Sequence, residues 1–181
     1  MPTPEFVSRL RSQVGHQLLW LSSAAGVVFD DDGRVLLGRR SDTGNWALPG
    51  GIIDPAEQPA DAAIREIFEE TGVVALPERL VAVSVSRPIT YDNGDRVQYL
   101  ELTFRCRAVG GDARVNDSES VEVGWHALGA LPELSERTLG RVTQAASGSA
   151  EAAFAFSGAP EVLGSLHDSR EFTMPHRPAA D

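Results

Sequence analysis

Between Gly51 and Val73 the sequence carries the pattern of one amphipathic helix, which we expect to run from about residue 58 to residue 71. Gly72 follows it, and a glycine in that place commonly ends a helix because it adopts a positive φ without strain. At about 100° per residue, four residues share one side of the helix and are expected to face the core: Ile64, Ile67, Phe68 and Thr71.

Three glutamates occupy the opposite side of the same helix: Glu66, Glu69 and Glu70. Like charges spaced three and four residues apart repel by a few tenths of a kcal/mol per pair. Arg65 can pair with Glu69 at i+4, but one arginine cannot neutralise three carboxylates. Mg²⁺ and Mn²⁺ prefer carboxylate oxygens, so the spacing favours a divalent metal site. Taken alone, the three acids are more typical of a solvated helix face.

The loop before the helix can add to such a site. Glu57 lies where the chain could fold back toward the glutamates, and the pair Gly50-Gly51 allows a close approach of the backbone. The Gly51 carbonyl could therefore also face a metal. Because a bound cation acidifies water and polarises phosphoryl oxygens, the segment suits the chemistry of phosphate esters or anhydrides.

The rest of the chain mixes strand and helix patterns. Helices are expected over residues 3–15 and over about ten residues after Ser135. Asp31–Gly33 and Asp92–Gly94 mark turns, and apolar runs predict strands over residues 18–29, 34–38, 80–86, 97–109 and 121–126. Strands mixed with two or three helices predict an α/β fold with a mixed β-sheet.

The two ends of the chain differ from its middle. We expect residues 1–17 to form an N-terminal helix or arm, residues 18–145 to form one domain, and residues 146–181 to be a loosely packed C-terminal extension. The N-terminal helix is interpreted as a packing element or as an arm of a homodimer, with a lid over a ligand as the alternative. The stretch beyond about residue 160 is expected to be a surface tail or a swapped arm.

Composition excludes several functions. The formal net charge is −10, which disfavours a nucleic-acid partner because counterion release needs a basic patch. All 16 basic residues are arginine, so no lysine can form a Schiff base or serve a P-loop. No apolar run is long enough for a membrane span. The single cysteine excludes an intramolecular disulfide and fits a reducing, cytoplasmic setting.

The full spacing of the segment from Gly51 to Val73 resembles the Nudix box of the Nudix hydrolase superfamily at every defined position: Gly51, Glu57, Arg65-Glu66-Ile67, Glu69-Glu70 and Gly72-Val73. A looser resemblance extends over about residues 18–145, through Trp125 and the Leu131-Pro132 turn. The resemblance implies an α/β/α sandwich. It also implies Mg²⁺- or Mn²⁺-dependent hydrolysis of a nucleoside diphosphate linked to another moiety, by attack of water on phosphorus.

The resemblance also implies roles for single residues. Glu66, Glu69 and Glu70 would be metal ligands, with Glu57 and the Gly51 carbonyl as further ligands, and Arg65 would hold the carboxylates by salt bridges. The general base in this superfamily is either a box glutamate or a glutamate on a distant loop. Glu119 and Glu122 lie about where such a loop residue would be, and alternation along a strand turns at most one of the two inward. As a candidate base we favour Glu119, in the Asp117-Ser118-Glu119 turn, although a plain surface acid is the more common role of such a residue.

The substrate is less constrained by the sequence. One of Arg39 and Arg40 is expected to contact the diphosphate through its planar guanidinium, and Trp46 is a candidate for stacking on a base or for packing in the core. Pro88 lies near a proline of ADP-ribose pyrophosphatases in this superfamily, and Tyr91 near a tyrosine of dinucleoside polyphosphate hydrolases. We favour ADP-ribose or a nucleotide sugar.

Two other functions remain open at this point. The chain could be a module that binds or senses a nucleotide on the same fold without turnover. It could also be an isomerase of diphosphate-bearing lipids, but that use of the fold would need a cysteine in the active cleft. Cys106 lies in an apolar strand pattern and is expected to be a buried core residue.

Overall fold

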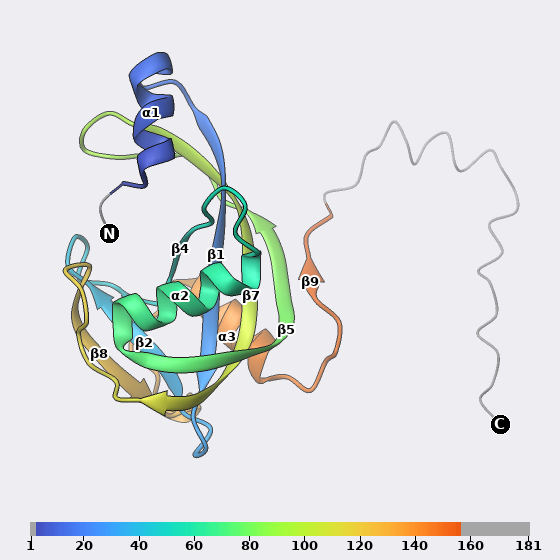
Figure 1. Ribbon diagram of the computed structural model, residues 1–181. Coiled ribbons are helices and arrows are strands. Elements are labelled where there is room, and N and C mark those ends of the chain that lie inside the picture. Colours follow the sequence, from blue (N-terminus) through green and yellow to red (C-terminus); the bar gives the residue numbers. More distant parts are fainter. Residues whose placement is uncertain (1–2, 157–181) are drawn as a thin grey trace, which may run out of the picture.

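The structure, a computed structural model, describes residues 3–156 (Figure 1). The described residues contain three α-helices and one 3-10 turn: α1 (Glu5–Val14), α2 (Pro59–Thr71), α3 (Glu136–Ala146) and η1 (Leu128–Ala130). They contain nine strands: β1 (Leu19–Phe29), β2 (Val35–Arg40), β3 (Trp46–Ala47), β4 (Gly50–Ile52), β5 (Val73–Val85), β6 (Ile89–Thr90), β7 (Arg96–Gly111), β8 (Ser120–His126) and β9 (Ala153–Phe154).

The strands form one mixed sheet in the order β3-β2-β1-β7-β5-β9, while β4 pairs with β1, β6 with β7 and β8 with β2. Strands β1 and β7 run parallel at its centre, and β5 and β7 are antiparallel. Both turn predictions next to strands are confirmed, because Gly33 and Gly94 adopt positive φ values of 74° and 86°.

Helices cover both faces of the sheet, which confirms the α/β/α sandwich (Figure 1). Side chains alternate along β1, so Val27 and Val28 point to opposite faces. Val28 belongs to a buried cluster with Ile67 of α2, and Val27 to a second cluster with Val142 of α3. Helix α1 packs near the start of β1, where Val7 joins Leu21 and Val97.

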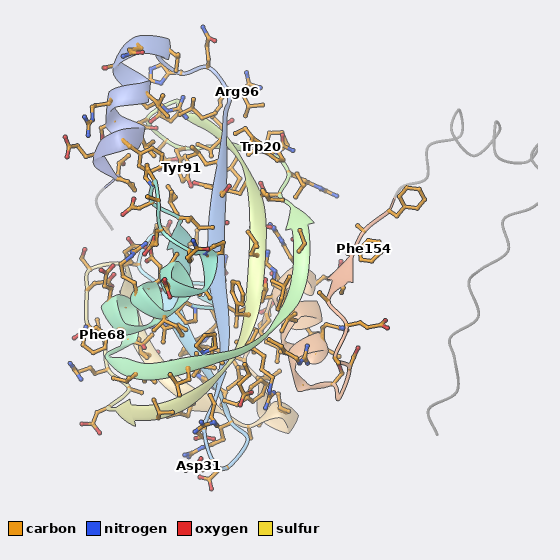
Figure 2. The ribbon with its side chains drawn as sticks, turned by 45° about the vertical axis from the view of Figure 1, so that its right-hand side comes forward. Trp20, Asp31, Phe68, Tyr91, Arg96 and Phe154 are labelled. Atoms are coloured by element: carbon orange, nitrogen blue, oxygen red, sulfur yellow. The ribbon has the colours of Figure 1, made fainter. Side chains whose placement is uncertain are left out.

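The orientation of α2 corrects one expectation. Phe68, predicted to face the core, is 47% exposed, and Figure 2 shows its ring on the outer side of α2. Glu66 and Glu70, predicted to lie opposite the core, are only 0% and 8% exposed. The buried side consists of Ala62, Ala63, Glu66, Ile67, Glu70 and Thr71. Small alanines let α2 lie close to Ala24 of β1, and this contact turns the two glutamates inward.

Other boundaries also differ from the expectations. Strand β5 begins at Val73 rather than near residue 80, because register shifts around Pro77 keep the strand paired with β7 where the sequence shows a proline. Within the C-terminal extension, β9 pairs in parallel with β5, and the prediction for residues beyond about 160 lies outside the described residues. Across residues 3–156, none of the helices combines the length and the apolar character that a membrane crossing requires.

Candidate active site

Strand β4 connects the glycine pair to the glutamates of α2. It pairs with the middle of β1, where Gly51 lies opposite Ala24 and Gly50 opposite Ala25. A Cβ atom on Gly51 would lie 2.4 Å from Glu66 Oε1, so only glycine leaves room for that carboxylate. The Gly50 N–H donates to Glu70 Oε1 over 2.8 Å. The two glycines thus bring backbone against both buried carboxylates, as the close-approach argument predicted.

Arg65 holds three carboxylates at once. Its Nε and Nη2 atoms donate to the two oxygens of Glu57 over 2.8 and 2.9 Å. Its Nη1 donates to Glu66 Oε1 over 2.7 Å and to Glu69 Oε2 over 3.2 Å. The hydrogen bonds from Arg65 lower the pKa of Glu57. The predicted i+4 pair with Glu69 is therefore present, but the bidentate pair with Glu57 is the larger part of this network.

Burial changes the acidity of the two inward glutamates. It raises the pKa of Glu66 to about 6 and the pKa of Glu70 to about 8, because the charged forms lose hydration. Glu66 Oε2 is buried and has no hydrogen-bond partner within the described part of the chain. A buried carboxylate oxygen without a donor is unfavourable unless a cation or water compensates it.

The donor set fits a hard cation. Among the described residues, no group of three acidic, histidine or cysteine side chains is already arranged around a position for a metal ion. Glu57, Glu66 and Glu69 are instead paired with Arg65. Mg²⁺ nevertheless needs only one or two carboxylates, because it keeps several waters. Glu66 and Glu70, one helical turn apart and both turned inward, supply that number of oxygen ligands.

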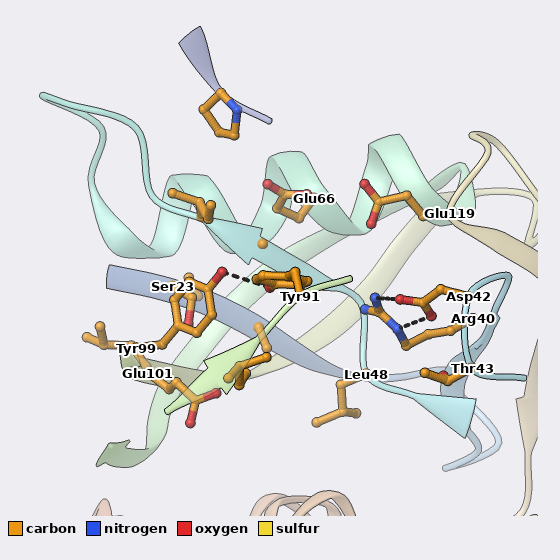
Figure 3. Close-up of a pocket in the computed structure, with 18 of the residues that line it drawn as sticks. Ser23, Arg40, Asp42, Thr43, Leu48, Glu66, Tyr91, Tyr99, Glu101 and Glu119 are labelled. Carbon is orange, nitrogen blue, oxygen red and sulfur yellow. Dashed lines mark hydrogen bonds and ion pairs between the residues drawn. The ribbon is translucent and has the colours of Figure 1, made fainter. Parts of the chain in front are cut away.

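A cavity of about 670 Å³ opens beside β4, and we call it the β4 cavity (Figure 3). Gly51, Glu66 and Glu119 contribute to one side of it. Other parts of its wall come from β2 and its following loop, from the turn after β6 and from β7: Arg40, Asp42, Tyr91, Tyr99 and Glu101. The cavity therefore joins the box segment to strands that are distant in the sequence.

The structure separates the two candidate arginines. Arg40 lines the cavity and donates to both carboxylate oxygens of Asp42 over 2.9 and 2.5 Å, which lowers the pKa of Asp42 to about 2. Arg39 does not line the cavity and pairs with Glu122 at 3.3 Å. This matches the expectation that neighbouring strand residues point to opposite sides.

The structure also gives the positions of the two candidate bases, Glu119 and Glu122, and of Trp46 relative to the cavity. Glu119 lines the cavity just before β8, where its backbone N–H donates to Asp117 over 2.9 Å. Glu122 is exposed and outside the cavity lining. Trp46 packs on the core and makes an edge-to-face contact with His126 at 4.7 Å between ring centroids, away from the cavity wall.

Several residues that line the cavity could not be recognised as site residues from the sequence. Tyr99 and Glu101 lie two positions apart on β7, and both line the cavity. Arg141 of α3 lines it too and donates a hydrogen bond to Glu101. Strand alternation could have paired Tyr99 with Glu101, but no pattern indicates that α3 lies over them. Tyr91, one of the two residues that gave conflicting indications of the substrate, lies in the wall, and its hydroxyl is 3.1 Å from that of Tyr99.

Cys106 is fully buried away from the cavity, and burial raises the pKa of its thiol to about 12.

Comparison with known proteins is consistent with this geometry. A MutT-like protein of Streptomyces ambofaciens is 42% identical over 103 residues, which make up 57% of this chain and 61% of that protein. The chain thus spans less than two thirds of that relative. A putative 8-oxo-dGTP diphosphatase of Bacillus subtilis (strain 168) is 34% identical over 114 residues, 63% of this chain and 71% of that protein.

A solved structure and a family model extend the likeness. The fold matches the crystal structure of an ADP-ribose pyrophosphatase from Streptococcus suis 89-1591 with a TM-score of 0.60 and 25% identity, covering 75% of this chain and 98% of that one. The family model described as NUDIX domain matches residues 20–145. This match includes strand β4, helix α2 and most of the residues that line the β4 cavity, and the chain therefore belongs to the Nudix hydrolase superfamily.

Proposed function

We propose that the chain hydrolyses a nucleoside diphosphate linked to another moiety, using Mg²⁺ or Mn²⁺. The observation that carries this proposal is the Glu66 carboxylate, fully buried, with one oxygen unpartnered in the described structure and in the wall of a cavity large enough for a nucleotide. Glu70, one helical turn away, is a second buried carboxylate, held against β4 by the Gly50 N–H.

The roles of single residues follow from their positions. Glu66 and Glu70 would hold the cation, with Glu69, Glu57 and the Gly51 carbonyl as further ligands. When bound, the cation lowers the pKa of water and polarises phosphoryl oxygens. Arg65 fixes the orientation of the carboxylates through its hydrogen bonds to Glu57 and Glu66.

Two cavity residues complete the proposed reaction. Glu119 would accept a proton from the attacking water, since it lines the cavity beside Glu66. Arg40 would contact the diphosphate with its guanidinium, which Asp42 orients. Arg39 pairs with Glu122 instead, and Trp46 packs on the core, so we assign neither of them a contact with the substrate.

For the substrate we favour ADP-ribose or a nucleotide sugar. The Streptococcus suis protein whose fold this chain shares is named an ADP-ribose pyrophosphatase. The Bacillus subtilis relative is named for 8-oxo-dGTP, which makes nucleoside triphosphates the competing class. A cytoplasmic location and a homodimer through residues 1–17 remain part of the proposal.

A substrate screen tests the function. ADP-ribose, nucleotide sugars, dinucleoside polyphosphates and nucleoside triphosphates are incubated with Mg²⁺ or Mn²⁺, and phosphate-bearing products are measured after phosphatase treatment. Glu70→Gln should reduce turnover by about a hundredfold or more, because metal-stabilised charge contributes several kcal/mol to the transition state. Glu122→Gln, outside the cavity, is the matched control.

Two outcomes would contradict the proposal. Wild-type turnover in Glu70→Gln would remove the catalytic assignment. Calorimetry that shows nucleotide binding without any turnover would favour the nucleotide-sensing module instead.

A further inference from the structure

Two arginines of α3 pair with Glu101 in the wall of the β4 cavity, and one of them, Arg141, lines the cavity itself. Arg141 donates to Glu101 Oε2 over 2.8 Å, and Arg137, one turn earlier, pairs with the same oxygen. Ser84 Oγ donates to this oxygen over 3.3 Å. Two guanidinium groups therefore share one carboxylate, which leaves a surplus of positive charge in a chain whose net charge is −10.

This surplus charge is largely withdrawn from water. The side chains of Glu101 and Arg141 are only 14% and 15% exposed, and that of Arg137 is 43% exposed. Burial lowers the pKa of Arg141, and burial together with the neighbouring Arg141 charge lowers the pKa of Arg137 to about 10. A buried guanidinium with an incomplete counter-charge is unfavourable, and a second anion would relieve it.

The other arginine in the described wall of the cavity has no such surplus. Arg40 donates through two nitrogens to both oxygens of Asp42, so this pair is balanced one to one. Arg141 hydrogen-bonds a single described residue, Glu101, through one nitrogen. Its remaining N–H groups are available to a ligand in the cavity that Arg141 lines.

The two charged regions lie on different sides of the cavity. In Figure 3 Glu101 lies across the pocket from Glu66 and Glu119. A ligand whose diphosphate lies beside Glu66 would therefore present its other half to Glu101 and Arg141.

We propose that Arg141, supported by Arg137, forms a subsite for a second oxyanion of the substrate, a carboxylate or a phosphate on the moiety beyond the scissile diphosphate. The planar fork of arginine matches both groups in two-point hydrogen bonding. Glu101 holds the two arginines in place and competes with the ligand for them. This inference rests on the proposed function and narrows its substrates to nucleoside diphosphate derivatives with an anionic distal group.

Direct anion binding tests the subsite without turnover. Inorganic phosphate is titrated calorimetrically into the full chain in EDTA, so that no cation contributes. Arg141→Gln should weaken phosphate binding about tenfold or more, and Arg141→Lys, which keeps the charge but not the fork, should weaken it less. Arg107→Gln, an exposed arginine of β7 outside the cavity, should leave it unchanged.

Glu101→Gln separates a binding role from a structural one. Removal of the competing carboxylate should strengthen phosphate binding, opposite to the effect of Arg141→Gln. If the ion pair only supported the fold, both variants would weaken binding in proportion to a loss of thermal stability, which is measured in parallel. No saturable phosphate binding by the wild type, or an unchanged Kd in Arg141→Gln, would overturn the subsite.

Matched substrates test its part in specificity. UDP-glucuronate differs from UDP-glucose by a carboxylate, and ADP-ribose 1″-phosphate differs from ADP-ribose by a phosphate on the distal ribose. We expect kcat/KM to favour the anionic member of at least one pair by about tenfold, and this ratio to fall toward one in Arg141→Gln.

The two proposals fail in different ways. If no substrate is hydrolysed but phosphate binds through Arg141, the proposed function is wrong; the anion-binding site at Arg141 stands, but its role in the choice of substrate is refuted with the function. If substrates are hydrolysed with a ratio that Arg141→Gln leaves unchanged, the subsite is wrong and the proposed function stands.

Discussion

Two of the acidic residues of α2, Glu66 and Glu70, are kept from water by their neighbours. Glu66 is fully buried, and Glu70 has its Oε1 engaged by the Gly50 N–H. Neighbouring carboxylates add to the loss of hydration: Glu69 and Glu57 disfavour the ionised form of Glu66, and Glu66 and Asp117 disfavour that of Glu70. This combination is typical of functional sites, where the unfavourable burial of charge is offset only when a ligand binds.

The raised pKa of Glu70 predicts a pH-dependent stability of the metal-free protein. The pKa of Glu70 is about 8 in the folded protein, above its value of 4.5 in the unfolded chain. Its contribution to the stability of the fold is therefore fully present below about pH 4.5. This contribution is lost as the pH rises through about 8. In EDTA, the free energy of unfolding of the wild type should therefore fall relative to that of Glu70→Gln between about pH 5 and pH 9. Urea titrations that give parallel pH profiles for the two proteins would contradict it.

Removal of Arg65 should destabilise the protein. Arg65→Ala leaves Glu57 and Glu66 without their counter-charge, and we expect a loss of about 2–3 kcal/mol in the free energy of unfolding, measured with urea. Arg107→Ala removes only an exposed pair with Glu78 at 3.6 Å and should cost at most about 1 kcal/mol. Equal losses in the two variants would show that the ion pairs of Arg65 with Glu57 and Glu66 contribute no more to stability than an exposed surface pair.

Among the elements, the three-residue strand β4 connects the sheet to the site. It pairs with β1 on one side and lies against the carboxylates of α2 on the other. Its two glycines face different constraints. A Cβ on Gly50 would meet backbone, 2.4 Å from Ala24 O, whereas a Cβ on Gly51 would meet only the Glu66 side chain.

These constraints predict different defects for two neighbouring substitutions. Gly50→Ala forces β4 away from β1 and should lower the free energy of unfolding by about 1–3 kcal/mol. Gly51→Ala displaces the Glu66 carboxylate and should reduce turnover about tenfold or more, with a smaller loss of stability. Urea unfolding and kcat measured side by side check this, and the reverse ranking would contradict it.

The wall of the β4 cavity is built from many parts of the chain, including both the N-terminal segment and α3. The box segment supplies Glu66, α3 supplies Arg141, and Pro4 at the start of α1 completes the wall. Helix α1 is held to the start of β7 by Arg11, which donates to the Arg96 carbonyl over 2.6 Å and pairs with Asp95 at 3.3 Å.

Arg11→Ala should therefore loosen α1 without unfolding the sheet. We expect faster hydrogen–deuterium exchange over residues 5–14, while the central part of β7 stays protected, because the lost contacts lie between the end of α1, the segment after it and the start of β7. Arg9→Ala, which removes an exposed pair with Glu5 at 3.3 Å, is the control and should not change exchange. Uniform exchange changes across the chain would contradict a local role.

The sequence alone determined the elements and the chemistry that local spacing controls. The α2 helix, its end at Gly72, the principal strands and the grouping of Glu66 with Glu70 all follow from periods of about 3.6 and 2 residues. Local spacing also indicated that Arg39 and Arg40 point to opposite sides. These features depend on neighbours within a few residues, so the sequence contains the information directly.

Only the tertiary structure decided which side of α2 is buried and which distant residues meet. Phe68 is exposed and Glu66 buried because contact with Ala24, not average hydrophobicity, sets the rotation of the helix. The pairing of Glu101 with Arg141, 40 positions apart, depends on α3 folding over β7. Burial and charge pairing of this kind are properties of contacts between remote segments, and no periodicity along the chain encodes them.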